Sequence, residues 1–560
     1  MPVNPASSSG RPAPPWLDVL ALLAGAITPL GFAPLALAPL AVLAPAVLFV
    51  LWLEPGASPG RAAWRGLLFG SGMFGVGVSW VFVSLHNFGN MPVPLAILAV
   101  ALLCAFLALY PALLGWLQAR FTGLSPALRF IVVLPALWTL FEWLRGWLLS
   151  GFPWLNLGYS QIDTPLAGFA PWLGVYGVSL AAAMSAGLIA AAWREREMLW
   201  RRHAPAFAGL WVLGWLAGLP QWVTPAGAPL RVALVQGNVA LAQKWDPLRR
   251  EAILENYFAL TERAQGAQVV IWPEAAIPTY LDRLDAGYLA RLRELVRSRN
   301  IDMLVGVIEK ESVGNRIAVF NSVVHFGAAS ASAPAHMTGR TSEASRASAS
   351  ARGRADGQDA RMPRSPGTAG SGLDPIGGDG SYRKRHLVPF GEFMPLPFLF
   401  QWFIDNFDIP MSDFSRGPAQ QPLLTVAGHR VGISVCYEDA FGEEVITALP
   451  QATLLVNVSE DAWFGDSLAP HQRLQMARLR ALESGRPMLR AANTGPSAVI
   501  DHRGALLARS RQFTIETLAA TVQPMEGATP YVRVGNVAVV VLVVAVLAAA
   551  WWAGRRRGPG

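Results

Sequence analysis

Long, uninterrupted apolar segments dominate the first 223 residues of the chain and recur once just before its C-terminus. A helix needs about 20 apolar residues to cross the hydrocarbon core of a bilayer. Seven segments before residue 224, and one near the end, meet this requirement. We therefore predict eight transmembrane helices, at residues 17–33, 35–53, 65–85, 93–117, 127–148, 165–192, 205–223 and 534–554.

Residues 230–530 have the different pattern of a globular domain. Short Val- and Ile-rich stretches bounded by turn residues alternate with segments whose apolar residues recur at helical spacing. Alternating strands and helices predict an α/β domain whose sheet is covered by helices. The strand-like stretches are 231–238, 267–274, 302–309, 321–326, 429–438, 452–459 and 496–504.

A low-complexity segment, residues 328–380, interrupts this domain. It consists mostly of Ser, Ala, Gly, Arg and Pro and contains no aromatic side chain. Such a composition cannot bury enough surface to offset the entropy of ordering it. We expect a disordered insertion that leaves the core of the domain unchanged.

The composition agrees with a membrane protein. Hydrophobic residues make up 53% of the chain and charged residues 15%, whereas soluble domains carry about 25% charged residues. Two cysteines, one of them in a predicted span, exclude a disulfide framework. The net charge of +8 is no sign of nucleic-acid binding, because the arginines lie between apolar segments and in the low-complexity segment.

Lys and Arg occur in alternate short loops between the predicted spans, which sets the orientation. This alternation places both tails, residues 1–15 and 555–560, in the cytoplasm and the 230–530 domain outside, in the bacterial periplasm. Arg145 is an exception near the outer end of the fifth span, where we expect it to snorkel to the interface. The loop arginines are Arg61, Arg65, Arg120, Arg129, Arg194, Arg196, Arg201, Arg202 and the run after the eighth span.

Three ionisable residues stand at the edges of strand-like stretches: Glu274 in "VVIWPE", Lys384 in "YRKRHLVPFGEF" and Cys436 in "GISVC". A thiol nucleophile needs a base to remove its proton and a cation or amide to hold the charge of a tetrahedral intermediate. Taken one at a time, each residue has a simpler explanation: Glu274 could cap a turn, Lys384 could be a solvated surface cation, and Cys436 could be a packed thiol. Together, in this order, they predict a catalytic set.

The motifs "IWPE", "YRKRHLVPFGE" and "CYE" resemble the three signatures of the nitrilase superfamily, whose Glu-Lys-Cys set lies on an α-β-β-α sandwich. With its apolar spans, the chain from residue 16 to about 554 resembles the apolipoprotein N-acyltransferase family. The resemblance implies a polytopic α-helical membrane protein with eight transmembrane helices. Its 230–530 domain would be a nitrilase-like sandwich, and the 328–380 insertion departs from the family pattern.

The resemblance implies a ping-pong reaction without cofactor or metal. An acyl group would pass from a membrane phospholipid to Cys436, and from the thioester to the α-amine of the diacylglyceryl-cysteine of an apolipoprotein. This would be the last step of lipoprotein maturation, performed by a monomer in the bacterial inner membrane. A periplasmic site has no ATP or acyl-CoA, so a donor taken from the bilayer also makes chemical sense.

Roles for individual residues also follow from the resemblance. Cys436 would be the nucleophile and Glu274 the general base, while Lys384 and the backbone N–H of the next tyrosine would stabilise the oxyanion. Glu392 would support the lysine or the base. The residues matching other positions that the family needs, expected at the substrate, are Trp245, Tyr437 and Glu438.

Two further segments are candidates for controlling access. Residues 393–407, "FMPLPFLFQWFIDNF", could lie in the bilayer interface as an entry arm, and residues 460–470 could form a second lid. Two alternatives stay open at this point: a membrane-anchored amidase or nitrilase that hydrolyses a small C–N bond, and a non-catalytic lipoprotein-binding module.

Overall fold

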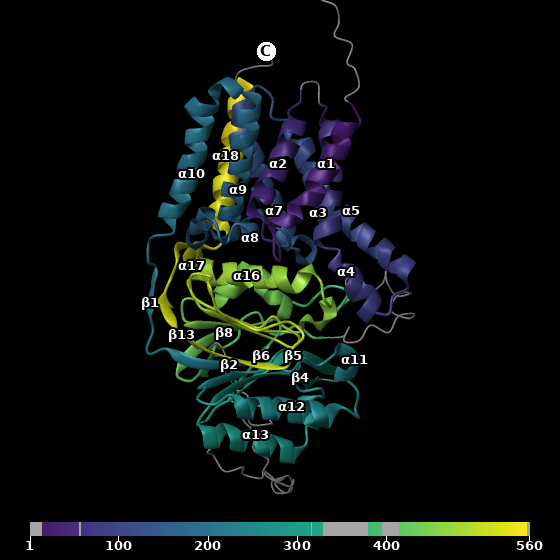
Figure 1. Cartoon of the computed structure of the whole chain (residues 1–560), viewed down its shortest axis with the longest axis vertical. Helices are drawn as coiled ribbons and strands as arrows, with labels where there is room; N and C mark the ends of the chain where they lie inside the picture. The colour runs from purple at the N-terminus through teal and green to yellow at the C-terminus, as the bar shows by residue number, and fades with distance from the viewer. Residues whose placement is uncertain (1–13, 55–57, 315, 329–378, 395–413, 557–560) are drawn as a thin grey trace, which may run out of the picture.

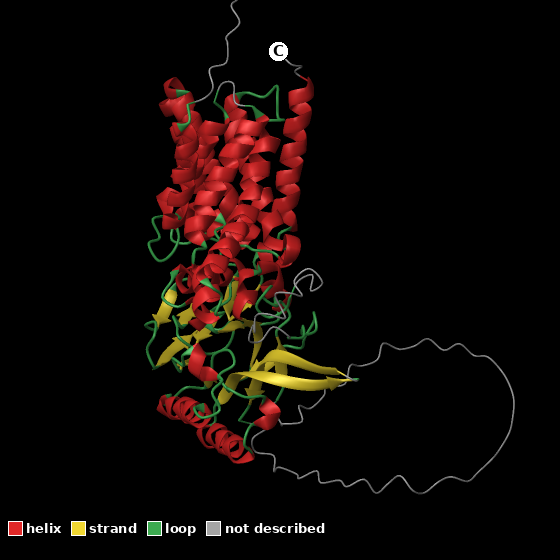
Figure 2. Ribbon diagram, turned by 90° about the vertical axis from the view of Figure 1, so that its right-hand side faces the viewer, coloured by secondary structure: helices red, strands yellow, loops and turns green. Residues whose placement is uncertain are grey.

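The computed structural model describes residues 14–54, 58–314, 316–328, 379–394 and 414–556. A layer of helices stands on a sandwich of two sheets (Figure 1), and Figure 2 shows the same two parts from the side. Most of the predicted 328–380 insertion, of the 393–407 arm and of the 1–15 tail lies outside the described residues, as does the end of the 555–560 tail.

Each of the eight predicted spans is helical, and the long helices run side by side in Figure 1. α1 begins, and α18 ends, at the end of the layer farthest from the sheets. The main helices are α1 (Trp16–Ile27), α2 (Ala38–Trp52), α3 (Pro59–Gly77), α5 (Val93–Gln118), α7 (Leu134–Trp147), α9 (Ala170–Arg194), α10 (Ala204–Ala217) and α18 (Val537–Arg556).

The lengths of the helices bear on the number of membrane spans. Among the described residues, four helical segments are long and apolar enough to cross a membrane, and a fifth candidate is the pair Pro59–Gly77 and Trp80–Phe88, bent by 50°. α1, α2 and α10 have 12, 15 and 14 residues. The helices therefore fit a membrane protein, while the count of eight spans stays a prediction.

Two six-stranded sheets lie face to face in the 230–530 region. In the first, the order is β13-β2-β3-β4-β5-β6, and in the second it is β12-β11-β10-β9-β8-β7. All seven predicted stretches contain a strand. The strands of the first sheet are β2 (Leu230–Gln236), β3 (Val269–Ile271), β4 (Asp302–Val313), β5 (Arg316–Phe326), β6 (Ser381–Arg383) and β13 (Glu516–Val522). Those of the second are β7 (Leu424–Val426), β8 (His429–Val435), β9 (Leu454–Ser459), β10 (Met488–Ala492), β11 (Ala498–Ile500) and β12 (Leu506–Arg509).

Apolar contacts arrange these sheets into four layers. Side chains such as Ile271, Val323 and Val456 fill the space between the two sheets. α12 (Arg250–Arg263) and α13 (Ala286–Arg299) cover the outer face of the first sheet through a second apolar cluster (Figure 1). The result is the α-β-β-α order expected from the resemblance.

α16 (Leu468–Ser484) is the fourth layer and joins the sandwich to the helices above it (Figure 1). Leu474, Ala477 and Ala481 recur at helical spacing and pack on the second sheet. Met476 and Leu479, on another face, belong to the core of the helical layer. α16 is therefore buried on both sides, between the second sheet and the helical layer.

The expectation that Arg145 snorkels to the interface is wrong. Its side chain is buried and donates hydrogen bonds to the carbonyl oxygen of Trp154, at 2.5 Å, and to Oδ1 of Asn156, at 2.6 Å. These acceptors lie in the loop after α7, so the guanidinium finds its partners inside the protein. Arg145 thereby fixes this loop, which contacts the sandwich through Gly151.

Candidate active site

The three predicted catalytic residues come together where strands of the two sheets end. Glu274 follows β3, Lys384 follows β6 of the same sheet, and Cys436 follows β8 of the facing sheet. Nζ of Lys384 lies 2.8 Å from Oε1 of Glu392 and 3.7 Å from Oε1 of Glu274. Sheet register thus places two carboxylates, one ammonium and one thiol in a single cluster.

Lys384 is the permanent positive charge of this cluster. Burial alone would lower its pKa, but the carboxylates of Glu392 and Glu274, together with Cys436, raise the pKa above its ordinary value. The side chain therefore stays an ammonium at any physiological pH. It cannot serve as a base, and its chemistry is that of a fixed cation.

Glu274 is buried and held through both carboxylate oxygens. Oε1 accepts a hydrogen bond from Nδ2 of Asn321 at 2.7 Å, and Oε2 accepts one from the backbone N–H of Glu460 at 2.7 Å. The same Nδ2 of Asn321 donates to Oε1 of Glu392 at 3.2 Å. These contacts fix the carboxylate in place beside the lysine.

Cys436 is a free, half-buried thiol on a sharp turn between β8 and the short helix η10 (Cys436–Ala440). Its φ of +52° lies in the left-handed region, a costly conformation for a residue other than glycine. Burial, followed by Glu274, raises its pKa to about 12, although Arg473 and Lys384 act to lower it. The resting residue is a thiol, so its reaction needs a neighbouring base.

Glu438 connects the loop of Lys384 to the turn of Cys436. Its carboxylate accepts hydrogen bonds from the hydroxyl of Tyr382, at 3.1 Å, and from the backbone N–H groups of Val435, Arg385 and His386. The side chain is buried. The sequence predicts that Glu438 contacts the substrate. This geometry instead favours a role in positioning the two loops.

Tyr437 and Trp245 lie at the margins of the cluster. The Tyr437 hydroxyl donates to the carbonyl oxygen of Gly151 at 3.0 Å, and its ring stacks on Trp154 with centroids 6.2 Å apart. Trp245 is 36% exposed and follows the buried Lys244, whose Nζ donates to the carbonyl oxygen of Glu274 at 3.0 Å. Tyr437 thus contacts the loop after α7, and Trp245 follows a lysine that contacts the backbone of Glu274.

The candidate lid, residues 460–470, contacts the helical layer. Its short helix η12 (Asp461–Phe464) accepts a hydrogen bond from the hydroxyl of Ser84 at the Trp463 carbonyl, 2.8 Å away. The ring of Phe464 meets that of Trp80 edge-on, with centroids 5.0 Å apart. The segment after Glu460 thus bridges the site and α4 (Trp80–Val83).

Comparisons with known proteins agree with this architecture. The family model described as apolipoprotein N-acyltransferase N-terminal domain matches residues 24–188, and that of carbon-nitrogen hydrolase matches residues 231–332 and 368–531. An apolipoprotein N-acyltransferase of Nitrosomonas europaea is 42% identical over 96% of this chain and 98% of its own length. The chain belongs to the apolipoprotein N-acyltransferase family. A second member, from Methylococcus capsulatus, is 42% identical over 92% of each chain.

Among solved structures, an amidase from Nesterenkonia aligns with 54% of the chain and 93% of its own length, at 17% identity and a TM-score of 0.32. The carbon-nitrogen hydrolase match of this N-acyltransferase family member omits residues 333–367, which fall inside the predicted insertion. The two family models together match the helical part and the sandwich part of the chain.

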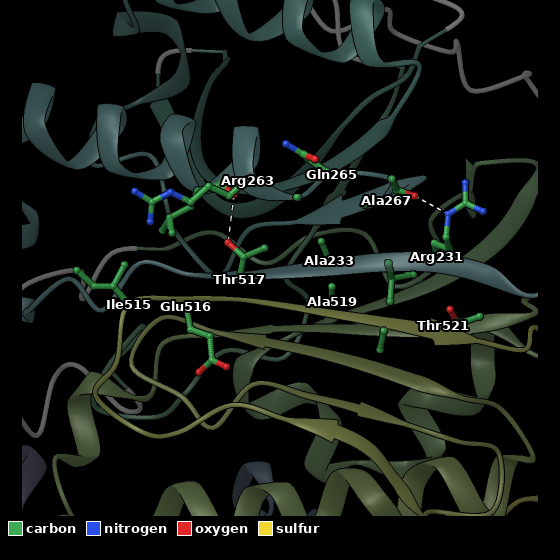
Figure 3. A pocket seen from close by; sticks show the side chains of 15 residues that line it. Arg231, Ala233, Arg263, Gln265, Ala267, Ile515, Glu516, Thr517, Ala519 and Thr521 are labelled. Carbon is green, nitrogen blue, oxygen red and sulfur yellow. Dashed lines mark hydrogen bonds between the residues drawn. The ribbon is translucent and has the colours of Figure 1, made fainter.

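Two pockets in the described part of this family member lie apart from the triad. One, of about 520 Å³, lies between α12 and strands β2 and β13, with Arg231 and Arg263 among its lining residues (Figure 3). The other, of about 580 Å³, lies along β7 and β8 and includes Tyr382. Neither Glu274, Lys384 nor Cys436 lines either pocket. Among the described residues, no group of His, Cys, Asp or Glu side chains is arranged to hold a metal ion.

Sequence reasoning missed several polar residues of the site. Asn321 lies inside a strand and Arg473 inside a helix, where the pattern of apolar residues does not single out a functional polar side chain. Lys244 immediately precedes Trp245 in "QKWD", so the motif that predicts Trp245 at the site also contains a lysine that contacts Glu274. A buried polar side chain amid apolar neighbours, as in "VFNSVVHF", was the available signal for Asn321.

Proposed function

We propose that this protein transfers an acyl group from a membrane phospholipid to the α-amine of the diacylglyceryl-cysteine at the N-terminus of an apolipoprotein. The observation that carries the proposal is the buried cluster of Glu274, Lys384 and Cys436, in a member of the apolipoprotein N-acyltransferase family. The protein would act as a single chain in the bacterial inner membrane, with its sandwich in the periplasm.

In the first half-reaction, the Cys436 thiol gives its proton to Glu274 and its sulfur attacks the ester carbonyl carbon of the phospholipid. Lys384 and the backbone N–H of Tyr437 hold the negative charge of the tetrahedral intermediate. The C–O bond then breaks, and Glu274 returns the proton to the departing oxygen. The products are a thioester on Cys436 and a lysophospholipid.

In the second half-reaction, the amine of the acceptor attacks the thioester carbonyl carbon. Its proton passes to Glu274, the C–S bond breaks, and the sulfur recovers a proton from Glu274. An ester and an amine thus become an alcohol and an amide. Water would compete for the thioester, so the buried position of the cluster protects the intermediate.

Acyl-enzyme formation tests the proposal directly. The full chain, incubated with phospholipid carrying a labelled acyl chain and no acceptor, should acquire a hydroxylamine-labile label that Cys436→Ser lacks. Lys384→Ala should lose turnover by at least about 100-fold, since an oxyanion donor is worth that much. Lys310→Ala is the matched control, because the Lys310 ammonium lies over the Tyr280 ring, 3.5 Å from its centroid.

Two results would overturn the proposal in favour of its alternatives. Ammonia release from small amides by the full chain, without acyl transfer to an amine, would indicate a membrane-anchored amidase. Full complementation of lipoprotein maturation by Cys436→Ala would indicate a non-catalytic binding module.

A further inference from the structure

Arg473, on α16, contacts the reacting atom of the site. Its Nη1 lies 3.5 Å from Sγ of Cys436, within hydrogen-bond range for sulfur, and its Nη2 donates to the carbonyl oxygen of the same residue at 2.6 Å. The guanidinium of Arg473 therefore contacts both the side chain and the backbone of Cys436. Neither the family signatures nor the triad accounts for this residue.

The guanidinium is held in place by a buried network. Arg473 pairs with Asp439 at 3.1 Å and with Asp461 at 2.9 Å, and its side chain is almost completely buried. Arg490 pairs with the same aspartates, at 2.6 Å from Asp461 and 3.7 Å from Asp439. Two arginines and two aspartates balance each other, so the planar donor of Arg473 keeps a fixed direction toward the sulfur.

We propose that Arg473 is a catalytic residue that stabilises the thiolate of Cys436 by donating a charge-assisted hydrogen bond to its sulfur. The inference deepens the proposed function, on which it rests, by dividing the charge between two cations. Lys384 serves the carbonyl oxygen of the acyl group, and Arg473 serves the sulfur.

The sulfur carries charge twice in the proposed cycle. It does so first when Glu274 has taken the thiol proton and the S–C bond is forming. It does so again when the amine displaces it and the C–S electron pair returns to sulfur. A positive donor at 3.5 Å lowers the energy of both states without taking a proton itself.

The electrostatic surroundings make such help necessary. The charged groups that act on the thiol are Glu274 and Glu392, which raise its pKa as burial does, and Arg473 and Lys384, which lower it. Lys384 is already engaged by both carboxylates. Arg473 is therefore the cation whose direct contact is with the sulfur.

The test measures thiol reactivity in the full, detergent-solubilised chain. A Cys104→Ala background removes the other cysteine, which lies in α5. Below the pKa of the thiol, the rate of alkylation by iodoacetamide is proportional to the fraction of thiolate. An opposite charge in contact shifts a pKa by about 1–3, so Arg473→Gln should slow alkylation at pH 8 by about 10-fold or more. Arg473→Lys should recover part of the rate.

Arg490→Gln is the matched control, because Arg490 binds the same aspartates but donates to Oδ1 of Asn457 at 2.8 Å. Because Arg490 helps to hold the two aspartates, the alkylation rate of this variant should also fall, but by less than about threefold, since Arg473 keeps its own contact with the sulfur. Equal losses in the two variants would overturn the inference, because the cause would then be collapse of the network. An unchanged rate in Arg473→Gln would overturn it as well.

A double variant, Arg473→Gln with Asp439→Asn, keeps the local charge balanced should the single variant fail to fold. Its thermal unfolding should match the parent, and its alkylation should be as slow as predicted for Arg473→Gln; a parental rate would overturn the inference. Alkylation requires no lipid. A parent that reacts as predicted but never forms an acyl-enzyme would refute the proposed function and leave the contact of Arg473 with the thiolate intact.

Discussion

Asn321 is the neutral residue on which both carboxylates of the site depend. One amide nitrogen donates to Glu274 at 2.7 Å and to Glu392 at 3.2 Å, and both glutamates also face Lys384. Without that amide, two carboxylates would share a single cation. Asn321 therefore keeps the general base and its neighbour at a fixed separation.

Replacing Asn321 by Leu should slow acyl-enzyme formation by about 10- to 100-fold, since a hydrogen bond to a charged group is worth about 1.5–3 kcal/mol. Single-turnover labelling with phospholipid measures this rate. Ser322→Ala is the matched control, because the next residue of a strand points to the opposite face. A parental rate in Asn321→Leu would show that Lys384 alone organises the carboxylates.

Residues at strand ends were predictable, and residues inside elements were not. Glu274, Lys384 and Cys436 each follow a strand, where a functional side chain departs from the apolar pattern in the sequence. Asn321 and Arg473 acquire their importance from partners 47 and 37 residues away. That proximity depends on sheet register and helix placement, which a single sequence does not fix.

At the scale of elements, α9 is broken where it meets the catalytic domain. Gly174 has a φ of +64°, and a Cβ there would lie 2.4 Å from the Tyr531 ring. The break frees the N–H of Val175, which donates to Oε2 of Glu483 from α16 at 3.0 Å. Oε1 of Glu483 pairs with Arg480 at 2.8 Å. The sequence predicts one continuous span at 165–192. It gives no sign of the break, because Glu483, which accepts a hydrogen bond from the freed N–H of Val175, belongs to another helix and lies 308 residues away in the chain.

This junction should make stability depend on pH. Burial raises the pKa of Glu483 from 4.5 to about 7, despite the opposing charge of Arg480. A carboxyl group whose pKa is raised in the folded state adds stability below pH 4.5, and this contribution is lost as pH rises to about 7.

Thermal unfolding of Glu483→Gln and of the parent, at pH 4.5 and pH 7.5, measures this effect. The stability of the parent relative to the variant should fall over that interval by about 3 kcal/mol, since one pKa unit corresponds to about 1.4 kcal/mol. The exposed Glu262, changed to Gln, is the control and should show no such trend. A constant difference between parent and Glu483→Gln would contradict the argument.

At the scale of the whole molecule, the cluster lies at the junction of the sandwich and the helical layer. Tyr437 reaches Gly151, Trp463 reaches Ser84, and Nε2 of His386 lies 3.1 Å from the carbonyl oxygen of Ser150. The order of the two parts along the chain was predictable from hydrophobic pattern. Their docking was not, because α16 shows only one periodic apolar face in sequence and yet is buried on two.

The proposed orientation can be measured on the whole chain. Leu248, before α12, is 93% exposed, and Trp200, between the sixth and seventh predicted spans, is 81% exposed. In a background of Cys104→Ala and Cys436→Ala, a membrane-impermeant maleimide should label Leu248→Cys in intact spheroplasts. It should label Trp200→Cys only after permeabilisation, because the arginines beside that position hold the loop in the cytoplasm. Labelling of both positions from outside, or of Trp200→Cys alone, would contradict the topology and move the active site away from its proposed compartment.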